Sequence, residues 1–113
     1  MKDFLLVFRN EFNAIPKASA EEMQATTKLW MDWIGSIAAQ NKLTDRGNSL
    51  LSGGKVVHPK NVVTDGPYME IKELIGGYSI IKVETYEEAV EIAKGCPILK
   101  FGGNVEVREV KHM

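Results

Sequence analysis

The sequence contains few of the residues on which several protein classes depend. It has one cysteine, Cys96, among 113 residues, so no disulfide can form within the chain. Only three of its 14 basic residues are arginines and the net charge is −1, which leaves little basic surface for nucleic-acid phosphates. The longest apolar run near the start, Phe4 to Phe8, is too short for a signal peptide or a membrane span. We therefore expect a cytoplasmic protein with neither a nucleic-acid nor a membrane partner.

The sequence also offers little for metals and cofactors. Its two histidines, His58 and His112, are far from each other and from Cys96, so no spacing typical of a zinc site occurs. None of the glycine pairs at 53–54, 76–77 and 102–103 belongs to a pattern that cradles phosphate at the start of a helix. The sequence predicts no metal and no cofactor.

The length and composition of the chain, with 44% hydrophobic and 26% charged residues, indicate one folded domain over residues 1–113. Residues 3–9 predict a central strand, because five consecutive apolar residues are bounded by polar ones. Ser19 precedes Glu22 by three residues, a capping box that predicts a helix start. An apolar stripe continues from Met23 to about residue 40, and we expect it to lie on the sheet. Thr85 and Glu88 predict the start of a second helix.

The remaining segments predict further strands. Residues 50–66 indicate one or two hairpins, and residues 76–83 indicate a longer strand that follows a charged segment of helical character at 70–73. Residues 102–110 alternate between apolar and charged side chains, typical of a strand with one face in water. This order predicts an α+β fold, a ferredoxin-like plait with an antiparallel sheet and two helices on one face. The other face would expose Ile, Val and Phe side chains, which predicts a sheet-to-sheet homodimer with a cleft at the helix-to-sheet edge.

Four segments, "GNSL" at 47–50, "TDGPYMEIKELIGGY" at 64–78, "EEAVEIAKGCP" at 87–97 and "GGNVEVREV" at 102–110, resemble the YCII-related family and its DGPF-motif subgroup, with Tyr68 in place of the usual Phe. The resemblance implies a dimeric α/β barrel of ferredoxin-like domains. In the wider family an Asp matching Asp65 can lie near a His on the first helix. This sequence has no histidine between Glu21 and Gln40, so His58, across the hairpin turn, is the alternative partner of Asp65.

Asp65 has two readings of equal weight. It precedes Gly66 and Pro67, where a carboxylate commonly accepts hydrogen bonds from its own turn. Alternatively it is a general base in the cleft, with its pKa shifted by His58 or Lys72. We name Asp65 and His58 as candidate catalytic residues. The candidate ligand-binding residues are Tyr68, Glu70, Lys72, Tyr78 and Trp30, although core packing alone would also account for Tyr78 and Trp30.

Two function hypotheses follow. The first is a cleft near the Asp-Gly-Pro turn that binds a small polar or aromatic metabolite, with cofactor-free acid–base chemistry of the lyase or hydrolase type. The second is a non-catalytic regulatory or interaction module with a protein partner, in which the turn only fixes the hairpin. The plait hosts many unrelated functions, so the fold does not decide between them.

Overall fold

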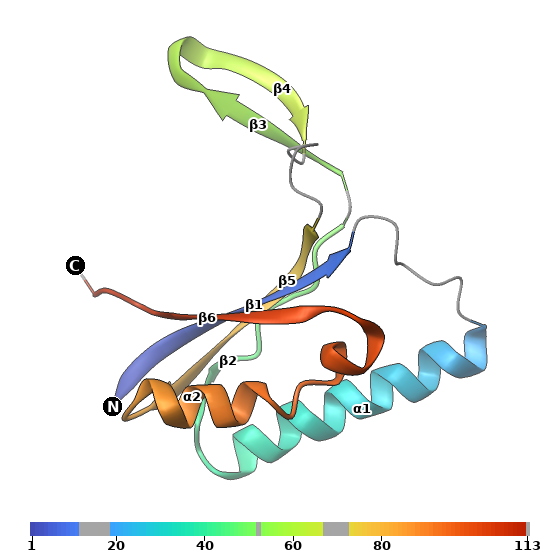
Figure 1. Ribbon diagram of the computed structural model, residues 1–113, viewed down its shortest axis with the longest axis vertical. Coiled ribbons are helices and arrows are strands. Elements are labelled where there is room, and N and C mark those ends of the chain that lie inside the picture. Colours follow the sequence, from blue (N-terminus) through green and yellow to red (C-terminus); the bar gives the residue numbers. More distant parts are fainter. Residues whose placement is uncertain (12–18, 52, 67–72, 113) are drawn as a thin grey trace.

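The computed structural model describes residues 1–11, 19–51, 53–66 and 73–112. Figure 1 shows its elements in sequence colours. In chain order they are β1 (Lys2–Glu11), α1 (Ala20–Ala39), β2 (Leu43–Asp45), β3 (Gly54–His58), the 3₁₀ turn η1 (Pro59–Asn61), β4 (Val62–Gly66), β5 (Glu73–Val83), α2 (Tyr86–Ala93), the 3₁₀ turn η2 (Pro97–Phe101) and β6 (Asn104–Glu109).

Four strands form one sheet in the order β2-β5-β1-β6, and every neighbouring pair is antiparallel. With α1 after β1 and α2 after β5, this is the β-α-β-β-α-β pattern of a ferredoxin-like plait. Both helices lie on the same side of the sheet (Figure 1). The predicted fold class and the central place of the first strand are therefore confirmed. The β3–β4 hairpin forms a separate two-stranded sheet, inserted between β2 and β5.

Each helix begins at the residue that its capping box predicts. The Ser19 hydroxyl accepts a hydrogen bond from the backbone N–H of Glu22 at 3.1 Å. The Thr85 hydroxyl accepts one from the N–H of Glu88 at 3.2 Å. These bonds satisfy amides that have no partner within the helix, and the acidic residues of the first turns complement the positive end of the helix dipole.

The core lies between the helices and the sheet. Side chains alternate along a strand, so Phe4, Leu6 and Phe8 of β1 all point toward the helices, and all three are buried. Trp33 of α1 packs on them and donates its indole N–H to the carbonyl oxygen of Ile92 at 3.1 Å. That bond ties α1 to α2 while it satisfies the polar atom of a buried aromatic ring.

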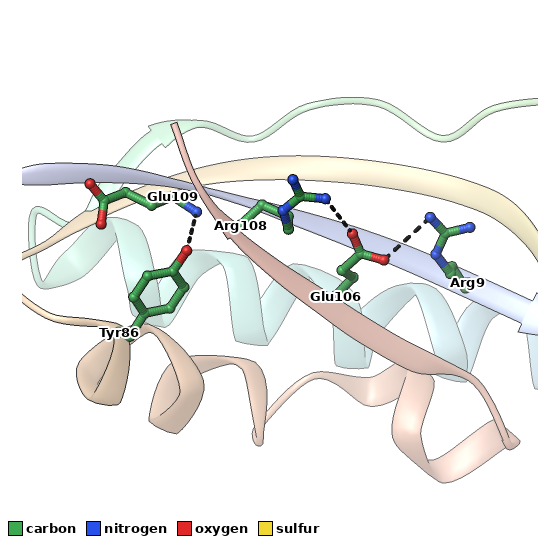
Figure 2. Close-up of polar contacts among 5 residues, drawn as sticks. All are labelled: Arg9, Tyr86, Glu106, Arg108 and Glu109. Carbon is green, nitrogen blue, oxygen red and sulfur yellow. Dashed lines mark hydrogen bonds and ion pairs between the residues drawn. The ribbon is translucent and has the colours of Figure 1, made fainter. Parts of the chain in front are cut away.

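The face of the sheet away from the helices, here called the open face, differs from the prediction. It carries no Phe from β1, because the phenylalanines occupy the alternate positions that face the helices. Val7 is 9% exposed and lies between Tyr78 of β5 and Glu106 of β6. Glu106 lies 3.4 Å from an Arg9 nitrogen and 3.2 Å from an Arg108 nitrogen. Figure 2 shows this carboxylate between the two guanidinium groups. The open face therefore combines apolar and charged side chains.

Two further expectations are corrected. Met23 does not lie on the sheet: its side chain is 60% exposed, because the first turns of α1 extend past the sheet (Figure 1). Glu73 is not helical, since it begins β5 opposite Glu11. The rest of the charged segment, residues 67–72, lies outside the described residues.

Candidate functional site

A cavity of about 730 Å³ lies at the edge of the sheet, between α1 and the chain that follows β2. Its walls come from the middle of α1, from residues 45–49, and from residues 76–79 of β5. Gly77 lets the backbone of residues 48–49 approach β5 closely, because a Cβ there would lie 2.8 Å from the Asn48 carbonyl oxygen. The predicted cleft was to form in a dimer near the Asp-Gly-Pro turn, whereas this cavity is formed within one chain and Asp65 is not among its lining residues.

The inner wall of the cavity is apolar. The Trp30 ring packs edge-to-face on Phe8, with ring centroids 4.9 Å apart and an angle of 76° between the planes. Trp30 also meets the Trp33 ring at 5.8 Å. Ile34 and Ile98 line the same wall. Because these aromatic contacts fix the Trp30 ring, it offers a rigid surface to a planar ligand.

The rim of the cavity is polar and closely fitted to β5. Gly47 has a φ of +70°, and a side chain there would overlap the carbonyl oxygen of Tyr78. The Asp45 carboxylate accepts a hydrogen bond from the Gly47 N–H at 2.8 Å. Buried Ser79 donates its hydroxyl to the Arg46 carbonyl oxygen at 2.6 Å, and the Tyr78 N–H donates to the Asn48 carbonyl oxygen at 3.2 Å. These hydrogen bonds hold the rim against β5.

This arrangement suits a small ring with charged or polar oxygens. The Arg46 side chain is exposed at the rim and carries a positive charge. A guanidinium group recognises oxyanions with two parallel donors, while the aromatic wall accepts a planar ring. The volume of the cavity is within the range of small-molecule sites, and its lining combines apolar side chains with at least as many polar ones.

Of the predicted site residues, Trp30 and Tyr78 line the cavity, and Asp65 and His58 do not. Trp30 packs on the helix side of the sheet. Tyr78 pairs with Val7, so its side chain lies on the open face, where its hydroxyl is 3.5 Å from the Asn48 amide nitrogen. The predicted ligand residues Tyr68, Glu70 and Lys72 lie outside the described residues.

Asp65 and His58 both lie on the β3–β4 hairpin but point to opposite faces of it. Lys55 pairs with Asp65 in the ladder, and Val56 pairs with Thr64. The Lys55 ammonium is 2.5 Å from the Asp65 carboxylate, and the His58 ring contacts the Thr64 hydroxyl at 2.9 Å on the other face. The His58–Asp65 pair expected across the hairpin therefore does not form within one chain, since side chains alternate along each strand.

Sequence reasoning did not assign the rim residues Asp45, Arg46 and Asn48 to the site. Part of the sequence evidence for these residues was available, because residues 47–50 already carried the family resemblance. The positive φ of Gly47 also explains why a glycine stands there. Their proximity to β5 depends on the pairing of Ser49 with Gly77, which no local pattern predicts.

In the described part of the chain, no three His, Cys, Asp or Glu side chains are grouped so that they could hold a metal ion. None of the described helices has both the length and the apolar character needed to cross a membrane. Burial raises the pKa of the Cys96 thiol from 9.0 to about 11, which keeps it protonated and makes it a poor nucleophile.

The model of the YCII-related domain matches residues 12–113, nearly the whole chain. The chain belongs to the YCII-related family. Its ferredoxin-like fold also matches a solved structure, 5-chloro-2-hydroxyhydroquinone dehydrochlorinase from Burkholderia phenoliruptrix AC1100 in complex with 2,5-dihydroxybenzoquinone. The TM-score is 0.55 and the identity 17%, over 97% of this YCII-related chain and 95% of the other. No curated protein sequence matches the chain significantly. Assignment to the DGPF-motif subgroup stays a prediction.

Proposed function

We propose that the cavity binds a small polar or aromatic metabolite and that the protein acts on it by cofactor-free acid–base chemistry of the lyase or hydrolase type. The observation that carries the proposal is the pairing of a fixed aromatic wall, Trp30 on Phe8, with a polar rim that presents Arg46. The dehydrochlorinase gives further support, because that protein of similar fold forms a complex with 2,5-dihydroxybenzoquinone. Of the ligands covered by the proposal, planar phenols and hydroxyquinones fit this wall and rim best.

Ligand binding is tested with 2,5-dihydroxybenzoquinone and a set of phenols and carboxylates, by thermal shift and by tryptophan fluorescence. A ligand at a hundredfold excess over its dissociation constant stabilises the folded state by about 2.7 kcal/mol. Arg46→Gln should weaken binding by about tenfold or more, because a charge-assisted hydrogen bond is lost. Lys94→Gln, which changes an exposed cation on α2, is the matched control and should bind as the wild type does. Equal affinities in both variants would remove Arg46 from the site.

The acid–base part of the proposal is tested separately with Asp65→Asn. If Asp65 is a base, the variant should fold and bind ligand but lose turnover. If Asp65 only holds the hairpin, Asn retains most of the hydrogen-bonding capacity of the turn and nothing should change. Lys55→Gln removes the cation that faces Asp65 and keeps the carboxylate, so it separates loss of the ion pair from loss of the base.

A homodimer in the cytoplasm remains our proposal for the assembled protein. The open face supports it, because apolar Leu5, Val7 and Ile80 lie beside the Arg9–Glu106–Arg108 cluster in one continuous surface. Two such faces could pair their charges reciprocally across a two-fold axis. Sedimentation velocity measured over a range of protein concentrations tests this.

The second candidate function is the non-catalytic interaction module. One observation favours it: Val57, Val62 and Val63 of the hairpin are 69%, 54% and 54% exposed. Exposed apolar groups of this kind typically mark a protein contact. If no ligand class raises the melting temperature of either the wild type or Arg46→Gln, this second function becomes the preferred one.

A further inference from the structure

One polar side chain interrupts the apolar inner wall of the cavity. Asn10 lies near the end of β1 and follows Phe8 at the alternate position, so both side chains point to the helix side of the sheet. Asn10 lines the cavity together with Phe8, Trp30 and Ile98. Its amide group is therefore part of the same wall as the Trp30 ring.

Glycines flank the Asn10 amide on both neighbouring strands. A Cβ atom at Gly76 of β5 would lie 3.0 Å from the amide nitrogen, and no other atom would be closer to it. A Cβ atom at Gly103, just before β6, would lie 3.0 Å from the amide oxygen and 2.6 Å from the Arg9 carbonyl oxygen. Gly103 is therefore needed for the backbone as well, whereas the absence of a side chain at Gly76 makes room chiefly for the amide.

The strand pairing is irregular at the same point. The register of β1 against β5 shifts between Phe8 and Arg9, and Gly76 is the extra residue of this β-bulge. Bulges are frequent next to binding and catalytic sites, where they redirect a side chain or end the pairing of two strands. This bulge lies where β5 passes both the cavity and Asn10.

The Asn10 amide has hydrogen-bonding capacity that the protein leaves unused. Among the residues that the structure describes, none hydrogen-bonds to its side-chain nitrogen or oxygen. The Thr27 and Ser79 hydroxyls also line the cavity, but each already donates to a backbone carbonyl oxygen, of Met23 and Arg46 respectively. A side-chain amide presents donors and an acceptor side by side, so the half-buried Asn10 offers both to a molecule in the cavity.

We infer that Asn10 binds two adjacent hydroxyl groups on the ring of the ligand, which is then a diphenol of the catechol type. The inference rests on the proposed function, because it concerns the same cavity. One hydroxyl group donates to the amide oxygen, and its neighbour accepts from the amide nitrogen. Hydroxyl groups on opposite sides of a ring cannot both reach one amide. A site that hydrogen-bonds a ligand in this way rejects an isomer that leaves the amide unpaired.

The test compares catechol, resorcinol and hydroquinone, isomers that differ only in the placement of their hydroxyl groups. Isothermal titration calorimetry without oxygen, which keeps the phenols reduced, measures their affinities. The wild type should bind catechol about tenfold more tightly than hydroquinone, as the gain of a neutral hydrogen bond predicts. Asn10→Leu keeps the branched shape but removes the polar atoms, so it should bind the isomers equally. Gln40→Leu, which removes an exposed amide at the end of α1, is the matched control and should keep the preference.

The role of Asn10 and the proposed function fail in different ways. Equal affinities of the wild type for the isomers, or a preference that Asn10→Leu retains, overturn the role of Asn10 and leave the proposed function standing. The first of these results needs no variant, so it decides the matter even if Asn10→Leu does not fold. Binding of 2,5-dihydroxybenzoquinone without binding of catechol likewise rejects only the role of Asn10. If the wild type binds none of these ligands, both fail. A catechol preference without turnover upholds Asn10 and rejects only the acid–base chemistry.

Discussion

The body of the protein and its β3–β4 hairpin use the same residue type to opposite effect. Val83 of β5 is 1% exposed and Val7 of β1 is 9% exposed, whereas Val57 and Val63 of the hairpin are 69% and 54% exposed. Strand pairing forms in both regions, because β-branched residues favour extended backbone. Only in the body does pairing also remove apolar surface from water, which is the larger source of stability.

The comparison separates two tasks within one short chain. The body buries Phe4, Leu6 and Ile81 completely and contains the hydrophobic core. The hairpin contributes no residue to that core, and its side chains Val57, Val62 and Val63 are exposed. The candidate acid–base residues Asp65 and His58 lie on the hairpin, whereas the rigid aromatic wall belongs to the body.

The largest effect expected from this difference comes from truncating one apolar side chain in each region. Phe4→Ala should lower the free energy of unfolding by about 3–5 kcal/mol, because it removes a fully buried ring and leaves a cavity beneath Tyr86. Val63→Ala should cost less than about 0.5 kcal/mol, as an exposed surface substitution does.

Urea denaturation at low micromolar protein concentration measures both values. The low concentration matters because self-association would make the measured stability depend on protein concentration. Equal losses in the two variants would mean that the hairpin belongs to the folding core, and the contrast between the regions would be wrong.

Most of the fold could be predicted because its signals are local. The capping residues Ser19 and Thr85 mark the two helix starts, and the alternation at Val105 and Val107 marks the edge strand. Met23 was misplaced because helical periodicity indicates which side of a helix is apolar but not how far the sheet extends beneath it.

The candidate site was harder to predict because its parts come together through long-range contacts. Trp30 and Tyr78 were named from the sequence and line the cavity, but Arg46 was not named. Its position depends on Ser79, 33 residues away, which binds the Arg46 carbonyl oxygen. The His58–Asp65 pair failed for a different reason, since closeness in a hairpin does not decide which face each side chain takes.

An intermediate effect is expected from pH. The body contains a buried ionisable group, Cys96, whereas the Lys55 and Asp65 side chains of the hairpin are exposed. Burial raises the pKa of the Cys96 thiol from 9.0 to about 11. Above pH 9 the unfolded thiol loses its proton while the folded one keeps it, so rising pH favours unfolding. The stability of the wild type relative to Cys96→Ala should therefore fall by about 2 kcal/mol between pH 9 and 11.

Urea midpoints of both proteins, measured from pH 7 to 11, give this difference directly. The other titrating groups are common to the two proteins and cancel. A constant difference across the range would show that the Cys96 thiol ionises equally in the folded and unfolded states.

The smallest effect extends the comparison of packed and projecting segments to the helices. Their caps have nearly equal bond lengths, 3.1 Å at Ser19 and 3.2 Å at Thr85, so intrinsic cap strength does not distinguish them. Thr85→Ala should cost about 1 kcal/mol, because α2 is short and packs on β5 and β6 from its first turns. Ser19→Ala should cost less, because the first turns of α1 extend past the sheet and can fray without exposing the core. Urea midpoints of the two variants give both costs. A larger loss for Ser19→Ala than for Thr85→Ala would instead show that the projecting turns of α1 support the fold.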